Sequence, residues 1–102
     1  MRKYKIVYSE KAAEDLDNLF NAITVDYQSP ITAFRYTQGI IDKIESLAIV
    51  PTAFAIRHNQ LFQQYGFNAR RVNYKKMAII YTIHDNMVFI HRIIAGSLIT
   101  EH

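Results

Sequence analysis

Five cationic side chains in the second half of the sequence carry the strongest chemical signal of this chain. They are Arg57, Arg70, Arg71, Lys75 and Lys76. Residues 1–50 hold six Lys or Arg against seven Asp or Glu, a net charge of −1, whereas residues 51–102 hold six against two, a net charge of +4. Such an imbalance attracts either nucleic acid or an acidic protein. Composition leaves both partners open, beside the simpler interpretation that these charges are only solvated.

The position of each cation in the pattern limits what it can contact. Arg70 and Arg71 lie where polar and apolar residues alternate, so they point to opposite faces of a strand. We expect at least one of them to bind a partner, the alternative being edge charges that deter sheet-to-sheet association. Lys75 and Lys76 lie in the following connection, where such a pair is as often a solvated turn as a contact.

Two further residues lie inside strongly apolar segments. A buried arginine must be paired, so Arg92 either contacts a partner on an open sheet face or forms an internal ion pair with a helix carboxylate such as Asp15. Tyr81 could act as an acid but is more often a packing residue.

Composition predicts one domain over residues 1–102 with a single modest core, because half of the residues are hydrophobic. There is no cysteine, which excludes disulfides and thiolate metal sites but does not indicate the compartment. The basic N-terminus leads into an apolar run too short for a signal peptide, and the longest apolar stretches are far shorter than the roughly 20 residues that cross a bilayer. We therefore expect a cytoplasmic protein that does not contact a membrane. His58, His84 and His91 could titrate near neutral pH, but they lack metal-ligand spacing, so neither a metal nor a cofactor is expected.

The first half of the chain predicts a strand and two helices. Residues 3–8 alternate as a strand does. Ser9 and Ser29 are suited to cap two helices, and apolar residues recur in both at three- and four-residue spacing. Pro51 ends the second helix, and Gly39 weakens it by about 1 kcal/mol relative to alanine. The short connection predicts an antiparallel helical hairpin.

The second half predicts a meander of three strands, at residues 68–74, 77–83 and 88–95, with another short strand possible at 60–65. The fold class is therefore α+β, in the order β-α-α-β-β-β, with a mostly antiparallel sheet. The helical hairpin can cover only one face of this sheet, so we expect the other face to be available for a ligand.

Several segments, in this order and at this spacing, resemble one known family. They are YSEKAAEDL at 8–16, LAIVP at 47–51, Gly66 with Arg70 and Arg71, AIIYTI at 78–83, and VFIHRII at 88–94. Together they resemble the RelE/ParE superfamily of bacterial toxins (plasmid stabilisation proteins). The resemblance implies a toxin that is neutralised by a flexible, acidic segment of a cognate antitoxin.

The superfamily divides into two functional groups, and this sequence is nearer to one. RelE-like toxins cut mRNA on the ribosome and carry an arginine before the aliphatic pair of the central strand, where this chain has Ala78. Their basic or aromatic tail is also missing from residues 97–102. ParE-like toxins bind DNA gyrase, and their closing strand resembles RIIAGSLI at 92–99, although its histidine, second arginine and aspartate are replaced here.

Three hypotheses follow from the resemblance. The first is a ParE-like toxin that binds an essential target such as gyrase, with the antitoxin or target contacting the five cations and Arg92. The second is a RelE-like ribosome-dependent endoribonuclease whose catalytic residues would come from Arg70, Arg71 and Tyr81, so whether this chain is an enzyme stays open. The third is a relative that binds its antitoxin without being toxic.

Overall fold

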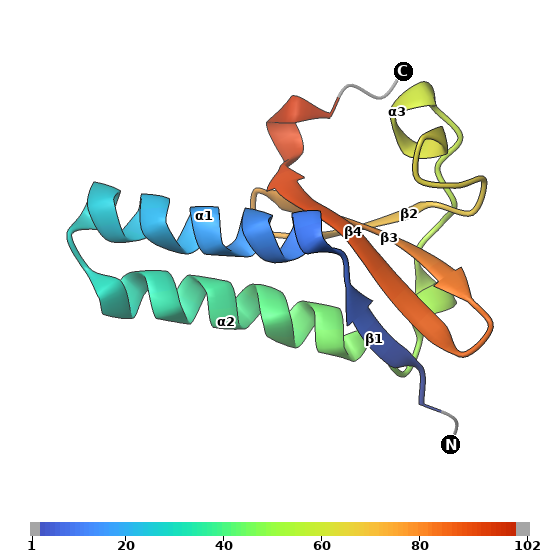
Figure 1. The fold of residues 1–102 in the computed structure, drawn as a ribbon, viewed down its shortest axis with the longest axis horizontal. Coiled ribbons are helices and arrows are strands. Elements are labelled where there is room, and N and C mark those ends of the chain that lie inside the picture. Colours follow the sequence, from blue (N-terminus) through green and yellow to red (C-terminus); the bar gives the residue numbers. More distant parts are fainter. Residues whose placement is uncertain (1–2, 100–102) are drawn as a thin grey trace.

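A computed structural model describes residues 3–99 of the chain, which form a helical hairpin and a four-stranded sheet (Figure 1). The elements, in chain order, are β1 (Lys5–Tyr8), α1 (Glu10–Tyr27), α2 (Pro30–Ser46), α3 (Gln60–Gln63), β2 (Arg70–Tyr74), β3 (Met77–His84) and β4 (Met87–Ala95). Two short 3-10 turns, Pro51–Ala53 and Gly96–Leu98, follow α2 and β4. The predicted α+β class and element order are confirmed, and the tail at 100–102 lies outside the described residues.

Local sequence signals determine both helices. The Ser9 hydroxyl accepts a hydrogen bond of 2.9 Å from the backbone N–H of Ala12, and the Ser29 hydroxyl accepts one of 3.2 Å from Thr32. Each bond satisfies an N–H group that the first helical turn leaves without a partner. Pro30 opens α2, where the missing proline N–H costs nothing. The two caps and the short link at Gln28 produce the predicted helical hairpin.

The sheet has the strand order β1-β4-β3-β2. β1 pairs with β4 in parallel, and the other neighbours are antiparallel. Two-residue turns, Lys75–Lys76 and Asp85–Asn86, connect the last three strands, and the first residue of each turn has a positive φ. The β2–β3 turn therefore presents two consecutive lysines at the end of the sheet that faces the helical hairpin.

The hairpin covers one face of the sheet. Most of the buried apolar side chains of this core come from α1, α2, β3 and β4: Ala12, Ile40, Ile44, Leu47, Val72, Ile79, Tyr81, Val88, Ile90 and Ile93. On β3 these are the residues at 79 and 81, so the side chains at 78, 80 and 82 point to the second face.

The second face is not bare, and the expectation of an open ligand face is wrong there. Phe62 of α3 and Ile99 of the C-terminal segment pack with Ala69, Ala78 and Ile80 into a second buried cluster. The segment expected as a strand at 60–65 is instead the short helix α3, because the Asn59 side chain caps the N–H of Phe62. An apolar face over β3 is covered by the chain itself rather than left for a partner.

The free end of the hairpin extends beyond the sheet (Figure 1). Four large apolar side chains there are between 59 and 73 % exposed: Val25, Tyr27, Ile31 and Phe34. Their exposure follows from the length of the two helices, since the last turns of α1 and the first turns of α2 have no strand to pack against.

Candidate protein-binding site

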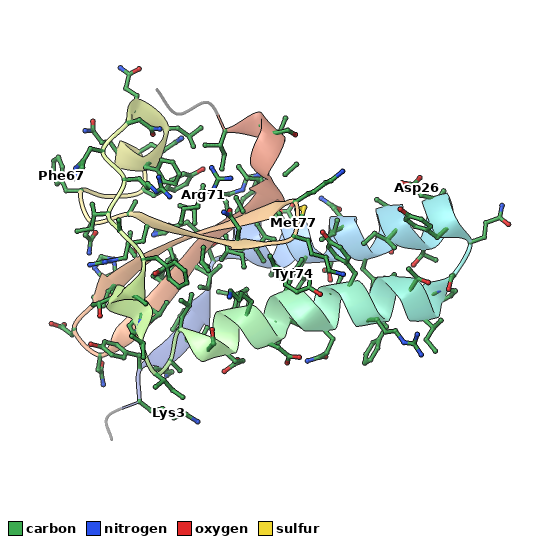
Figure 2. The ribbon with its side chains drawn as sticks, turned by 180° about the vertical axis from the view of Figure 1, so that it is seen from behind. Lys3, Asp26, Phe67, Arg71, Tyr74 and Met77 are labelled. Atoms are coloured by element: carbon green, nitrogen blue, oxygen red, sulfur yellow. The ribbon has the colours of Figure 1, made fainter. Side chains whose placement is uncertain are left out.

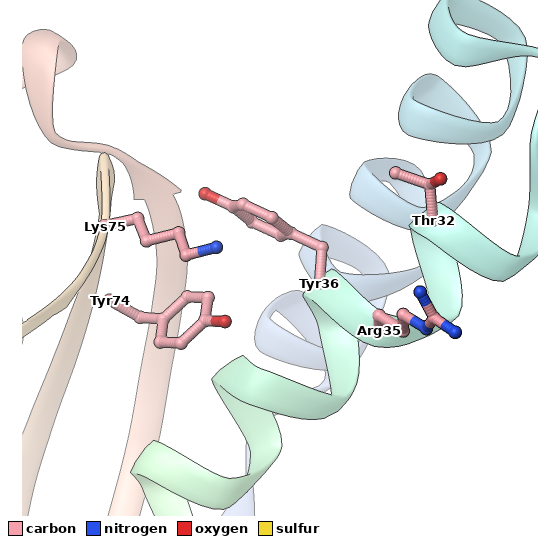
Figure 3. Close-up of a pocket in the computed structure, with 5 residues that line it drawn as sticks. All are labelled: Thr32, Arg35, Tyr36, Tyr74 and Lys75. Atoms are coloured by element: carbon pink, nitrogen blue, oxygen red, sulfur yellow. The ribbon is translucent and has the colours of Figure 1, made fainter.

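The β2–β3 turn places a lysine between two tyrosines. The Nζ atom of Lys75 lies 5.5 Å from the ring centroid of Tyr36 and 5.5 Å from that of Tyr74 (Figure 3). The two rings meet edge to face, with centroids 5.4 Å apart and planes at 83°. A cation this close to two aromatic faces is attracted by both ring quadrupoles, so the ammonium of Lys75 is held in place although the residue is exposed.

The backbone of Lys76 fixes the turn on both sides. Its carbonyl accepts a hydrogen bond of 2.8 Å from the N–H of Gly96 at the end of β4. Its N–H donates to the Tyr36 hydroxyl of α2. Burial, and then the neighbouring Tyr74, raise the pKa of Tyr36, so this phenol remains neutral at physiological pH. The turn is thus tied to α2 as well as to β4.

Three hollows share Lys75. The first, of about 590 Å³, lies between the helices and the turn, with Leu19, Ile23, Asp26, Tyr27, Thr32, Tyr36, Lys75 and Lys76 around it. The second, of about 300 Å³, is lined by Thr32, Arg35, Tyr36, Tyr74 and Lys75 (Figure 3). The third, of about 370 Å³, lies between the turn and the end of β4 and includes Arg71, Lys76 and Ser97. Among the described residues that line them, Asp26 is the one acid.

Arg70 and Arg71 point to opposite faces, as expected for neighbours on a strand. Arg71 lies on the second face, where its Nε donates 2.8 Å to Asn73 and its side chain lines the hollow beside Gly96. Arg70 lies on the other face and donates from Nη1 to the carbonyl oxygen of Phe54. Only Arg71 therefore belongs to the surface around Lys75.

Tyr81 lies in the core beside Arg70, its partner in the β2–β3 register. It is fully buried, and its hydroxyl donates a hydrogen bond of 2.6 Å to the carbonyl oxygen of Pro51. Burial raises the pKa of Tyr81 to about 12, although the nearby Arg70 opposes this shift. A group that neither reaches the surface nor releases its proton easily is unsuited to acid catalysis, so the possible catalytic role for Tyr81 finds no support here.

Arg92 has the internal partner that the sequence left as the alternative. Its Nε and Nη2 lie 2.8 and 3.1 Å from the two carboxylate oxygens of Asp15. The same carboxylate accepts a bond of 2.9 Å from the N–H of Ile93. The Asp15 side chain is 10 % exposed and that of Arg92 27 %. This bidentate pair fastens α1 to β4 and occupies the guanidinium that was expected to contact a partner.

Arg57 lies apart from the surface around Lys75. Its backbone N–H donates 2.8 Å to the carbonyl of Ala69, beside the isolated bridge between Ile56 and Arg70. It lines none of the three hollows that share Lys75. Of the six residues expected to bind a partner, the fold thus brings together Arg71, Lys75 and Lys76.

Sequence reasoning missed Arg35, Tyr36 and Tyr74. Tyr74 directly precedes the two lysines, and a Tyr-Lys-Lys run in a turn could have suggested an aromatic neighbour for the charge. Nothing in the local sequence links Tyr36 to Lys75, because the two are separated by most of α2 and the whole of α3. Figure 2 shows Tyr74 beside α2, whereas Phe67 lies at the far end of the sheet, near α3.

His84 and His91 form a separate group on the second face. The Thr82 hydroxyl lies 2.8 Å from Nε2 of His84 and 2.8 Å from Nε2 of His91. Burial, and then His84, lower the pKa of His91. Over residues 3–99, no three His, Cys, Asp or Glu side chains are grouped so that they could hold a metal ion. None of the helices in that range is long and apolar enough to cross a membrane.

Comparison with known proteins identifies relatives of the whole fold. Residues 6–97 match a family described as the ParE toxin of type II toxin–antitoxin systems, parDE. A solved structure of the chromosomal ParDE toxin–antitoxin system from P. aeruginosa superposes with a TM-score of 0.76 at 20 % identity, covering 93 % of this chain and 98 % of that one. No curated protein sequence matches this chain significantly.

Proposed function

This chain belongs to the ParE toxin family of type II toxin–antitoxin systems, and we propose that it arrests growth by binding an essential cytoplasmic target such as DNA gyrase, while a cognate antitoxin neutralises it. Both activities are protein binding rather than catalysis. The solved relative is itself a toxin–antitoxin system. In this proposal the antitoxin supplies an acidic segment that orders on contact with the cationic half of the chain.

Protein binding is favoured over RNA cutting because two of the candidate catalytic side chains already form hydrogen bonds within the fold. Arg70 donates to the Phe54 carbonyl, and the buried hydroxyl of Tyr81 donates to Pro51. Cleavage of an RNA strand needs a base, an acid and positive charge around one phosphate. Ala78, at the position where RelE-like toxins carry an arginine, is fully buried in the second cluster. Arg71 alone of the three candidates faces the hollowed surface, which supports binding better than cleavage.

Three assays on the purified and the expressed chain separate the hypotheses. We expect induced expression to stop growth, the purified chain to inhibit supercoiling by gyrase, and ribosome-bound mRNA to stay intact in primer-extension assays. Intact supercoiling together with mRNA cut at the ribosome would replace the proposal with a RelE-like enzyme. Normal growth under strong expression would indicate a relative that binds its antitoxin without being toxic.

A further inference from the structure

We propose that the antitoxin docks in a notch between the helical hairpin and the β2–β3 turn, and that a carboxylate of its segment meets the ammonium of Lys75. The notch is the first of the three hollows described above, and its lining includes Leu19, Ile23, Asp26, Tyr27, Lys75 and Lys76. This inference rests on the proposed function, and it moves the binding site from the sheet face that the sequence suggested to the opening beside the turn.

The walls of the notch suit apolar side chains. Its volume of about 590 Å³ falls within the usual range of roughly 300–1,000 Å³ for binding pockets. Leu19 and Ile23 are only half-buried, and Tyr27 at its rim is 69 % exposed. Val25 and Ile31, at the same end of the hairpin, are also exposed, although they do not line the notch. Half-buried and exposed apolar groups at the opening of a hollow are typical of a contact site for proteins.

The charge around the notch selects the chemistry of the occupant. Lys75 lines all three hollows and Lys76 lines two of them. Arg35 lines the hollow of about 300 Å³, and Arg71 lines the one of about 370 Å³. Asp26 is the one acid among the described residues that line them. The surplus of positive charge at an apolar opening favours a segment that carries carboxylates next to apolar side chains.

The turn is already ordered for binding. The rings of Tyr36 and Tyr74 hold the Lys75 ammonium at 5.5 Å, and the Lys76 backbone is bonded to both α2 and β4. A lysine that is fixed in advance loses less side-chain entropy when a carboxylate arrives than a freely rotating one does. Preorganisation therefore makes Lys75 the residue whose loss should weaken binding most.

A peptide fits the notch better than a nucleic acid does. A polynucleotide is bound by a basic track that follows its phosphates, with bases stacked on aromatic faces. Here the two ring faces nearest the charge are occupied by Lys75 itself. Aliphatic walls from Leu19 and Ile23, with Asp26 beside them, offer no phosphate contact.

The test uses the full chain and, as probe, the cognate antitoxin, which we expect a short reading frame adjacent to the gene to encode. Lys75→Gln with Lys76→Gln should raise the Kd of the complex roughly tenfold at low salt and reduce its salt dependence. The matched control, Lys3→Gln with Lys5→Gln, removes the same charge from exposed positions before and at the start of β1 and should change the Kd less than about twofold. Tyr27→Ala should also weaken binding, whereas Val50→Ala, at a residue of similar exposure outside the notch, should not.

The outcomes separate this inference from the function on which it rests. If the double lysine variant folds and still arrests growth, but the antitoxin no longer restores growth, the notch is supported as the antitoxin site. If both pairs of lysine substitutions weakened antitoxin binding equally, the attraction would be a general effect of charge. If binding were unchanged in all variants, the antitoxin would dock elsewhere. Either result overturns the notch as the binding site and leaves the proposed function standing. If the double lysine variant lost binding to an RNA or duplex DNA oligonucleotide but still bound the antitoxin, that result would also overturn the notch as the antitoxin site. Absence of any complex with the wild-type chain would overturn the proposed function as well.

Discussion

The phenol of Tyr74 occupies the space that a side chain at Gly39 would need. A Cβ atom placed at Gly39 would lie 2.0 Å from the Tyr74 hydroxyl oxygen and 2.3 Å from the ring carbon that bears it. Glycine costs a helix interior about 1 kcal/mol relative to alanine. Here that cost leaves room for the Tyr74 ring, which lies with Tyr36 against the ammonium of Lys75. The glycine that weakens α2 in the sequence is thus the residue that lets β2 approach it.

The first prediction concerns this approach. Gly39→Ala should lower the free energy of unfolding by about 1–3 kcal/mol, because overpacking against Tyr74 exceeds the gain in helix propensity. Tyr74→Ala removes the obstructing ring. Tyr74→Ala should therefore lower the free energy of unfolding less in the Gly39→Ala variant than in the wild-type protein. Urea denaturation of the four proteins of this cycle measures the difference. Strict additivity would contradict the packing.

The second prediction concerns the ion pair between α1 and β4. Asp15→Asn leaves the Arg92 guanidinium without its countercharge, and we expect a loss of about 1–3 kcal/mol in the free energy of unfolding. The loss should be smaller than for a fully buried ion pair, because water partly solvates Arg92 and screens its charge. Glu14→Gln, at an exposed neighbouring position, is the control and should change stability by less than about 0.5 kcal/mol. Equal effects of the two variants would show that the pair contributes little.

The third prediction separates the two adjacent arginines. Arg70→Gln removes the donor to the Phe54 carbonyl and should destabilise the chain by about 1–3 kcal/mol. Arg71→Gln should leave stability nearly unchanged but weaken binding of the antitoxin, because Arg71 lines the hollow beside the β2–β3 turn. Thermal unfolding and titration with the antitoxin measure the two effects. Toxicity lost in folded Arg71→Gln, with antitoxin binding retained, would instead assign Arg71 to the target.

The fourth prediction concerns pH. The pKa of His91 is lowered in the folded protein by burial and by His84, so the unfolded chain binds the proton more readily. Stability from the neutral imidazole is therefore fully present above the unfolded pKa of about 6.5 and is lost as the pH falls below it. Between about pH 7.5 and about pH 5, the free energy of unfolding should decline.

The control for this prediction is another histidine of the same chain. His91→Gln should flatten the decline, because it removes the group whose proton uptake differs between the two states. His58→Gln, at an exposed position, should leave the slope as it is. Denaturant titrations at a series of pH values give both slopes. A decline that persists in His91→Gln would assign the acid sensitivity to other groups.

Local sequence signals are enough to predict the elements that depend on near neighbours. Ser9, Ser29 and Pro30 start the helices through bonds within one turn, and the β-branched residues at 79–83 form a central strand through their own geometry. The opposite facing of Arg70 and Arg71 follows from strand alternation alone. Such signals act over a few residues, so they can be read without knowing the rest of the fold.

Which side chains meet depends instead on how distant segments pack. Asp15 and Arg92 lie 77 positions apart, and their bond depends on how α1 crosses β4. Tyr36 reaches Lys75 because Gly39 lets Tyr74 approach α2, and Phe62 covers the second face because Asn59 starts a helix where a strand was expected. Each depends on packing between distant segments, where the free energy comes from burial and charge pairing rather than from local propensity.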